Sequence, residues 1–321
     1  MTDRTMKAVL FDRYGDPGVL YVGRVPQPVP APGEVLVRVR AFSVNGGELA
    51  ARSGKVRLLT GRKFPQRVGL DFTGEVAALG AGTTAFAVGD RVWGVVARTA
   101  GFGTAAEYVT VAADRAGPVP DGLDLVDAAA LPVATTAVTA LRDKAALRPG
   151  ERLLVRGAAG GVGTTAVQLG HAYGAEVTAL ARAANLGFVR GLGAAHAFDH
   201  RTVPPAELGR FDVVLDTVGT DLPTFRRLLA PGGRMVTITF DLTRLVASLG
   251  YIAASAAHGR GRVRAFSGNP KRTDFDDLAR HVAEGKLRPA VDKVFSLAET
   301  AAAHRALEAG GVRGKYVVRV D

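Results

Sequence analysis

A glycine-rich turn between an apolar strand and a helix is the feature that most constrains this chain. The segment 153–156, Leu-Leu-Val-Arg, has the makeup of a buried strand, and a helix is expected from about Thr164. Glycine permits the tight turn, the close approach of backbone N–H groups to phosphate oxygens and close packing of the helix on the strand. This position in the chain predicts a dinucleotide-binding Rossmann unit rather than an ordinary strand-to-helix connection. The expected cofactor-binding residues of the turn are Gly157, Ala158, Ala159, Gly160, Gly161, Val162 and Gly163.

The end of the next strand distinguishes the two nicotinamide cofactors, because NAD-binding proteins usually carry an Asp or Glu there. Residues 178–185 read Thr-Ala-Leu-Ala-Arg-Ala-Ala-Asn, with no acid and with one arginine, Arg182. A guanidinium pairs with a 2′-phosphate, whereas a carboxylate would repel it. We therefore expect NADPH (NADP) as the cofactor, with Arg182 on its 2′-phosphate. The alternative for Arg182 is an exposed residue at the start of a helix.

The chain after residue 150 alternates strand-like and helix-like stretches. Strands are expected at 152–156, 176–180, 211–216, 234–239 and 263–267, and helices at 162–173, 185–191, 222–229 and 274–284. Such alternation implies right-handed crossovers and a parallel sheet covered on both faces. The predicted fold class is α/β, with a Rossmann doubly wound parallel-sheet domain at 121–286.

The first 120 residues are rich in short β-branched runs punctuated by Gly and Pro, which is typical of a β-rich domain. Strands are expected at 7–11, 34–42, 71–79, 90–95 and 106–111, and an alanine-rich helix at 123–143 follows. The C-terminal strands at 290–295 and 315–320, which flank a helix at 298–309, are assigned to this first domain. The β-rich domain is thus predicted at 1–120 and 287–321, with the nucleotide-binding domain inserted in it.

The composition excludes several classes of site and partner. Cysteine is absent from the 321 residues, which rules out disulfides and thiolate-ligated zinc or iron–sulfur centres. The net charge of +11 comes mostly from scattered arginines, so nucleic acid is not expected as a main partner. The longest uncharged stretches, 128–141 and 245–257, are too short for a membrane span. Because Met1–Lys7 has no apolar signal region, the expected location is cytoplasmic.

Motifs spread over essentially the whole chain resemble one enzyme family. They include Asn45 in Ala-Phe-Ser-Val-Asn (41–45), Gly-Leu-Asp-Phe-Thr-Gly (69–74), Val-Gly-Asp-Arg-Val-Trp-Gly (88–94), Asp-Thr-Val-Gly (216–219) and Gly314-Lys315. In these motifs and in its glycine turn the chain resembles the zinc-independent quinone oxidoreductases, often called zeta-crystallin-like, of the medium-chain dehydrogenase/reductase superfamily. The resemblance implies a GroES-like substrate domain, a Rossmann domain, a cleft between them and a homodimer.

The same resemblance implies that no metal is used. Zinc-dependent relatives bind the metal through Cys and His, and where their Gly-His-Glu motif would stand this chain has Gly69-Leu70-Asp71. No group is then left to polarise an alcohol or carbonyl oxygen as zinc does. The small-molecule partner implied is a quinone, an enone or an enoyl compound, which receives hydride from NADPH.

Individual roles follow from matching positions in the family. Asn45 matches an asparagine near the nicotinamide and is the candidate catalytic residue, with capping of a turn as its alternative. Thr136 matches a helix-start threonine that contacts the cofactor, and Lys315 is placed with the cofactor-binding residues. At the 2′-phosphate the family's lysine and tyrosine are replaced by Asn185 and His200. The expected phosphate contacts therefore fall on Arg182, assisted by His200 and Arg201.

The proton donor and the substrate are less constrained. Where some members have a tyrosine, this chain has Ala50, so the proton is expected from water, with Tyr108 and Tyr251 as minor alternatives. Motifs typical of short-chain reductases, NTPases, zinc proteases and serine hydrolases do not occur. Two rival functions remain: an enoyl reductase of a biosynthetic pathway using polyketide-like or acyl-thioester substrates, and a non-catalytic NADPH-binding structural or RNA-binding protein.

Overall fold

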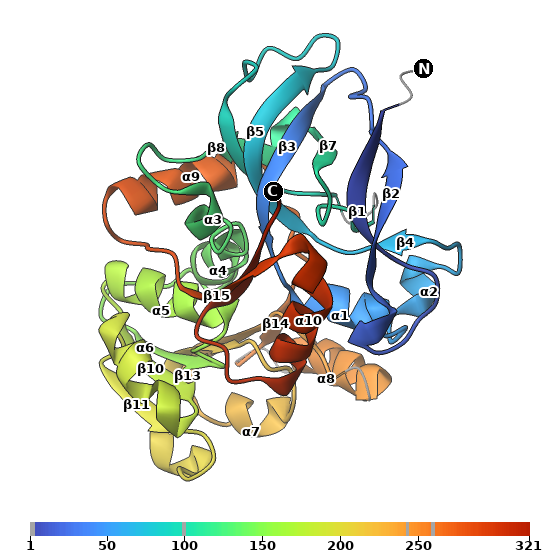
Figure 1. Cartoon of the computed structure of the whole chain (residues 1–321). Helices are drawn as coiled ribbons and strands as arrows, with labels where there is room; N and C mark the ends of the chain where they lie inside the picture. Colours follow the sequence, from blue (N-terminus) through green and yellow to red (C-terminus); the bar gives the residue numbers. More distant parts are fainter. Residues whose placement is uncertain (1–3, 98–100, 242–243, 258–260) are drawn as a thin grey trace. The chain divides into compact units, whose positions relative to one another are not determined.

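The computed structural model describes residues 4–97, 101–241, 244–257 and 261–321 (Figure 1). The chain divides into two compact units. Unit 1 comprises Met1–Pro132 and Asn269–Asp321, and unit 2 comprises Val133–Gly268. Unit 2 is thus inserted between two segments of unit 1, and each unit is described by itself below.

Unit 2 is built on a six-stranded parallel sheet in the order β11-β10-β9-β12-β13-β14. The central strands are almost purely apolar, and Leu153, Leu154 and Val155 are fully buried, as expected for a parallel sheet covered on both faces. The strand bounds are β9 Arg152–Arg156, β10 Glu176–Ala181, β11 His196–Asp199, β12 Phe211–Asp216, β13 Leu229–Thr237 and β14 Val263–Ala265.

This strand order is that of a Rossmann fold, because the chain first builds outward from β9 to β11 and then restarts at β12 on the other side of β9. Right-handed crossovers in two opposite directions place the helices on opposite faces of the sheet. The connecting helices are α5 Gly161–Ala172 and α6 Leu186–Gly191 in the first half, and α7 Leu222–Arg226 and α8 Leu245–Ala257 in the second (Figure 1). The predicted doubly wound sheet is confirmed.

Unit 2 opens with a short helix and also contains two 3-10 turns. Helix α4, Ala134–Val138, continues into a π-helical segment, η4 Thr139–Lys144, and α4 packs on α5. The 3-10 turns are η5 Ala183–Asn185 and η6 Pro205–Leu208.

Unit 1 contains two sheets, and the C-terminal segment of the chain contributes strands only to the larger one. A three-stranded sheet has the order β2-β1-β4, and a seven-stranded sheet has the order β15-β16-β3-β5-β6-β8, with β7 also paired to β3. The strand bounds are β1 Thr5–Phe11, β2 Tyr21–Pro26, β3 Glu34–Ser43, β4 Gln66–Arg67, β5 Asp71–Leu79, β6 Arg91–Val95, β7 Tyr108–Ala112, β8 Ala116–Pro118, β15 Val291–Ser296 and β16 Lys315–Arg319.

The core of unit 1 lies against the long strand β3, whose Val35, Val37 and Val39 alternate inward and join Phe42 and Phe72. The helices and turns around it are η1 Pro17–Val19, α1 Gly46–Arg52, α2 Arg57–Thr60, η3 Ala113–Arg115, α3 Leu125–Ala128, α9 Arg272–Ala283, η8 Leu297–Glu299 and α10 Thr300–Ala309. In the part of the chain that is described, none of the helices combines the length and the apolar character needed to cross a membrane.

Two expected elements differ from the structure. The alanine-rich helix expected at 123–143 is interrupted into α3, α4 and η4, because Pro132 cannot donate a helical hydrogen bond and restricts the residue before it. The helix expected at 222–229 ends at Arg226, since Leu229 already pairs with Phe211 as the start of β13. Strand β11 was not among the expected strands. The predicted nucleotide-binding domain, 121–286, includes α3 and α9. In the structure these two helices pack on strands of unit 1.

The close packing of α5 on β9 leads to a test of stability. A Cβ added to Gly163 would lie 2.1 Å from the carbonyl oxygen of Gly157 and 2.8 Å from Cα of Ala158, so backbone must move. We expect Gly163→Ala to lower the free energy of unfolding by about 1–3 kcal/mol in urea denaturation. Gly187 is the control, because in α6 its added Cβ meets nothing within 4 Å. Gly187→Ala should leave stability unchanged or raise it by up to about 1 kcal/mol, and equal losses in both variants would contradict the packing argument.

Candidate functional site

The glycine turn has the geometry that a phosphate-binding loop needs. Gly157 adopts φ +74°, and a Cβ there would lie 2.3 Å from Oγ1 of Thr217. The Gly160 N–H donates to the Gly157 carbonyl at 3.1 Å, which closes the turn, and α5 begins at Gly161. The first N–H groups of a helix have no intrahelical partner and favour an anion. No acidic residue lies in the first turn of α5, so the positive end of this helix is not neutralised there.

The residues expected at a 2′-phosphate lie at the same edge of the sheet. Ala158 N–H donates to the Leu180 carbonyl at 3.0 Å, which ties the glycine turn to the end of β10. Arg182 follows β10 directly and is half-buried. His200 is exposed, and its N–H donates to the carbonyl of Ala181 at 3.1 Å. Arg182 and His200 are therefore both anchored at the carboxyl end of β10.

Thr136 belongs to the same unit. It is half-buried on α4, the helix that packs against α5. It follows that Thr136 is placed by the element next to the phosphate-binding helix and not by the turn itself.

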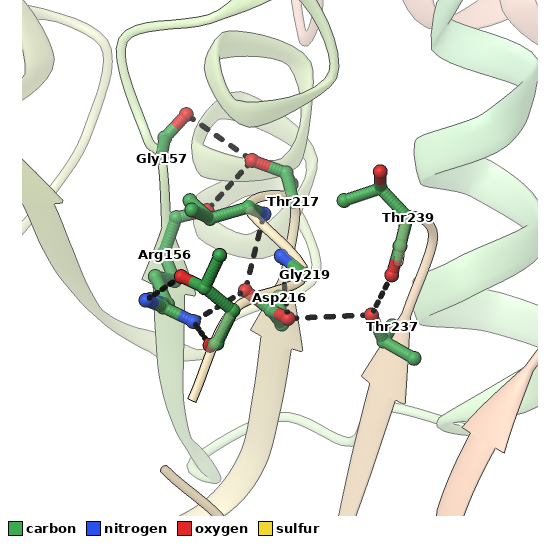
Figure 2. A network of polar contacts seen from close by, with 9 residues as sticks. Arg156, Gly157, Asp216, Thr217, Gly219, Thr237 and Thr239 are labelled. Atoms are coloured by element: carbon green, nitrogen blue, oxygen red, sulfur yellow. Dashed lines mark hydrogen bonds and ion pairs between the residues drawn. The ribbon is translucent and has the colours of Figure 1, made fainter. Parts of the chain in front are cut away.

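A buried carboxylate connects the loops at the switch point of the sheet (Figure 2). Asp216, at the end of β12, is fully buried. Its Oδ1 accepts from Nη1 of Arg156 at 3.2 Å and from the Val218 N–H at 3.1 Å, and its Oδ2 accepts from the Gly219 N–H at 3.0 Å. Thr237 Oγ1, at the end of β13, lies 3.2 Å from Oδ2. One side chain thus ties together the carboxyl ends of β9, β12 and β13.

Arg156 and Thr217 complete this network from the strand that precedes the glycine turn. The Arg156 guanidinium also donates to the carbonyl oxygen of Thr220, and it lies over the ring of Phe225, 3.9 Å from its centroid. Thr217 Oγ1 donates to the Arg156 carbonyl at 2.8 Å. Burial raises the pKa of Asp216 and lowers that of Arg156, and the ion pair between them opposes both shifts. The network fixes the crevice at which open α/β sheets bind ligands.

A second polar cluster lies in unit 1 around Asn45. Its Nδ2 donates to Asp71 Oδ2 at 2.9 Å and to the Ser43 carbonyl at 3.0 Å, while its Oδ1 accepts from Lys315 Nζ at 2.6 Å. Lys315 Nζ also donates to the Val44 carbonyl at 2.9 Å. The structure therefore joins Asn45 and Lys315, two residues that the sequence analysis assigned to different roles.

Two buried carboxylates surround this pair. Glu48, in the first turn of α1, accepts the Asn45 N–H at 2.5 Å and the Gly69 N–H at 2.6 Å. Asp71 accepts the N–H of Ser43 at 2.6 Å and its hydroxyl at 2.5 Å. Glu48 is completely inaccessible to solvent, and Asp71 and Lys315 nearly so. The cluster brings two acids and one ammonium together out of solvent.

Burial dominates the titration of this cluster. It raises the pKa of Glu48 to about 7, because the desolvation and the charge of Asp71 outweigh the two backbone hydrogen bonds and the charge of Lys315. Burial likewise lowers the pKa of Lys315, against the attraction of Asp71 and Glu48. Asp71 stands in the segment where zinc-dependent relatives have their Gly-His-Glu motif. Among the described residues, no group of three or more His, Cys, Asp or Glu side chains is placed to hold a metal ion.

Comparison with known proteins identifies the family. A model of the alcohol dehydrogenase GroES-like domain matches residues 31–121, and one of a zinc-binding dehydrogenase matches residues 192–318. A mitochondrial NAD(P)H oxidoreductase from Homo sapiens is 31% identical over 98% of this chain and 89% of its own. The quinone oxidoreductase of Coxiella burnetii is 30% identical, with a TM-score of 0.91 over 99% of this chain and 100% of that one. The chain belongs to the quinone oxidoreductase family of the medium-chain dehydrogenase/reductase superfamily.

The protein is therefore an NAD(P)H-dependent oxidoreductase of the quinone oxidoreductase type, with a GroES-like domain and a Rossmann domain. One further relative bears on the substrate. A mycocerosic acid synthase-like polyketide synthase from Mycobacterium tuberculosis is 34% identical over 92% of this chain, which corresponds to 14% of that much longer protein.

Sequence reasoning gave no role to several residues of the oxidoreductase that organise these sites. Asp216 was only part of a family motif, although an acid that ends an otherwise apolar strand is itself a signal of a buried, paired charge. Glu48 could have been noticed as the third helical position after Asn45, the spacing of a capping box. Arg156 and Thr217 gave no comparable signal, because their partners come from another strand.

The titration of Glu48 gives a test by pH. Between the ordinary value of 4.5 and about 7 the folded protein binds one more proton at Glu48 than the unfolded chain does, so the free energy of unfolding falls as the pH rises. Glu48→Gln should remove this trend. Relative to the variant, the free energy of unfolding of the wild type should fall by up to about 1.4 kcal/mol per pH unit between pH 5 and 7, measured by urea denaturation.

The lowered pKa of Lys315 contributes the opposite trend, in which stability rises with pH, and comparison with Glu48→Gln at each pH separates the two trends because Lys315 is present in both proteins. Glu207→Gln serves as the control, because Glu207 is exposed. Parallel pH profiles for the wild type and Glu48→Gln would show that Glu48 does not titrate in this window.

Proposed function

We propose that this oxidoreductase uses NADPH, without zinc, to transfer hydride to a quinone or to an α,β-unsaturated carbonyl compound. The observation that carries the cofactor assignment is the carboxyl edge of the Rossmann sheet, where the glycine turn and Arg182 lie beside each other. Because Arg182, and no acid, directly follows β10 along the chain, the end of this strand offers a 2′-phosphate a positive charge.

The residues present fit a dinucleotide. The glycine turn lacks side chains where a pyrophosphate would approach, and the α5 N-terminus supplies N–H groups and a positive dipole. Within the described residues, the Arg182 guanidinium has no hydrogen-bond or ion-pair partner of its own, so it is available to a phosphate. His200 and Thr136 are proposed as further cofactor contacts. The Asp216 network would hold the turn in place while the cofactor exchanges.

When bound, the reduced nicotinamide supplies two electrons and a proton as hydride. Reduction of a quinone or an enone then requires one proton from elsewhere to complete the hydroquinone or the saturated ketone. Ala50 offers no phenol, and we propose water as the proton source. The protein contributes orientation, through Asn45 and the residues that hold it, and exclusion of competing reactions. Lys315 would act on the ligand through Asn45, since its ammonium is enclosed by Val44 and Asn45.

Zinc independence is proposed on the residues themselves. The chain has no cysteine, and Leu70 stands where the zinc-dependent relatives have a histidine ligand. A leucine has no atom that coordinates a metal. The homodimer stays a prediction. The cytoplasmic location also stays a prediction, since the human relative is named as mitochondrial.

Reduction of an enoyl thioester is the second candidate, because the similarity to part of a polyketide synthase extends over nearly the whole chain. It uses the same hydride transfer to an activated carbon–carbon double bond. The two candidates differ only in the group that activates the acceptor.

The cofactor preference is tested at Arg182. A charge-assisted hydrogen bond to a phosphate contributes about 1.5–3 kcal/mol, so Arg182→Ala should weaken NADPH binding by about 10- to 100-fold and leave NADH binding unchanged. Arg148→Ala is the control, since Arg148 is exposed and precedes the opposite end of β9. Tighter binding of NADH than of NADPH by the wild type, measured by fluorescence titration, would refute the assignment.

The substrate class is tested by NADPH consumption with a benzoquinone, an alkenal and crotonyl thioester. Turnover of the quinone or the alkenal at a kcat/KM at least about tenfold above that of the thioester is expected, which corresponds to about 1.4 kcal/mol of transition-state binding. The reverse order would favour the enoyl reductase. Tight binding of NADPH without turnover of any of the three would favour a non-catalytic protein.

A further inference from the structure

The hydrogen-bonding capacity of the Asn45 side chain is almost fully used inside unit 1. A carboxamide has two N–H donors and two oxygen lone pairs. Both donors are engaged, by the Ser43 carbonyl and by Asp71 Oδ2, and one lone pair is engaged by Lys315 Nζ. What remains is one lone pair on Oδ1.

The chemistry of the three partners determines the positions of the oxygen and of the NH2 group of the amide. A carbonyl oxygen and an ionised carboxylate only accept, and an ammonium only donates. Rotation of the amide by 180° would set its oxygen against the oxygens of Ser43 and Asp71 and its NH2 against Lys315. Because three contacts of 2.6–3.0 Å would become repulsive together, the observed orientation is strongly preferred.

The amide nevertheless lies at the edge of the cluster and not in its centre. Asn45 is half-buried, whereas Ser43 and Glu48 are fully buried and Asp71 and Lys315 nearly so. All three side-chain hydrogen bonds of Asn45 are partly buried, whereas the contact of Lys315 with the Val44 carbonyl is buried. Asn45 is thus the member of the cluster that a ligand can approach, and its one unused hydrogen-bonding position is the lone pair on Oδ1.

We infer that Asn45 meets a bound ligand as a hydrogen-bond acceptor through Oδ1, and that Lys315 and Asp71 are the positioning residues that keep its NH2 turned away. This inference rests on the proposed function. Asn45 would select a ligand group with an N–H or O–H, and it would not donate to the carbonyl oxygen of a quinone or an enone. Two ligand groups have this chemistry: the carboxamide N–H of a nicotinamide and the hydroxyl of a hydroquinone product.

The test compares ligands that differ by one donor. The 3-acetylpyridine analogue of NADP⁺ replaces the carboxamide NH2 by a methyl group and keeps the carbonyl. Its Kd and that of NADP⁺ are measured by calorimetry for the wild type, Asn45→Ala and Asn45→Asp, and a second arm measures a hydroquinone against its quinone. If NAD⁺ proves the better cofactor, its own acetylpyridine analogue serves equally, because the carboxamide is common to both.

For one of the two ligand pairs, we expect the wild type to bind the ligand that carries the donor more tightly than its partner. This preference, expressed as a ratio of Kd values, should be about 2- to 10-fold larger in the wild type than in Asn45→Ala, the range of one neutral hydrogen bond. Asn45→Asp keeps an acceptor oxygen for Lys315, and its second oxygen must carry a proton to donate to Asp71 as the NH2 does. In that form it should keep the preference, whereas it would lose a preference that depends on the NH2. The arm in which the preference disappears identifies the ligand group. Circular dichroism confirms folding, and if Asn45→Ala does not fold, the comparison of Asn45→Asp with the wild type still decides.

Two results would overturn the inference: unchanged preferences in Asn45→Ala, or a loss of affinity for the quinone but not for the hydroquinone in both variants, which would make Asn45 a donor. Failure of the proposed function gives a different result. The wild type would then bind neither nicotinamide dinucleotide nor quinone, and the inference would fall with it.

Discussion

The carboxylate of Asp216 is the contact on which the architecture of the cofactor site depends. An open parallel sheet leaves its loops to diverge where the strand order reverses, and here that divergence is bridged by one buried acid that binds Arg156, two N–H groups of its own loop and the hydroxyl of Thr237. Burial of a lone carboxylate is costly, and its three N–H donors offset that cost, while the single Thr237 proton is shared with the nearer Thr239 carbonyl. The glycine turn is therefore held by the ionic and polar contacts of Asp216 and by the hydrogen bond of Ala158 to the end of β10.

Unit 1 solves a different electrostatic problem with the same means. Glu48 and Asp71 are both removed from solvent, and the Lys315 ammonium is the positive charge placed beside them. In zinc-dependent members of the superfamily the corresponding segment has a histidine that coordinates the metal, and in this chain it has Leu70. An internal cation carried on a side chain orients a neighbouring amide. In the function that we propose, this site recognises the ligand and the redox step belongs to the cofactor.

Local sequence was a good guide wherever the structure depends on neighbours in the chain. Strand β9 and the glycine turn could be predicted because an apolar run, a tight turn and a helix follow one another directly, and β12 and β16 could be predicted from their own apolar runs. The prediction of one helix at 123–143 was wrong, because it rested on the alanine-rich composition and gave too little weight to Pro132, which interrupts the helix. The partnership of Asn45 with Lys315 could not be derived, because 270 positions separate them and only the pairing of β16 with β3 brings them together. Long-range hydrogen bonds between side chains leave no periodic trace in a sequence.

The position of Lys315 in the chain has a consequence for biosynthesis. Strand β16 is an inner strand of its sheet, between β15 and β3, yet in the chain it follows every other described strand. Until it leaves the ribosome, the sheet has a gap beside β3, and Glu48 and Asp71 have no ammonium with which to be buried. All strands of the inserted unit have been made by then. Unit 2 can therefore fold while unit 1 still lacks strand β16.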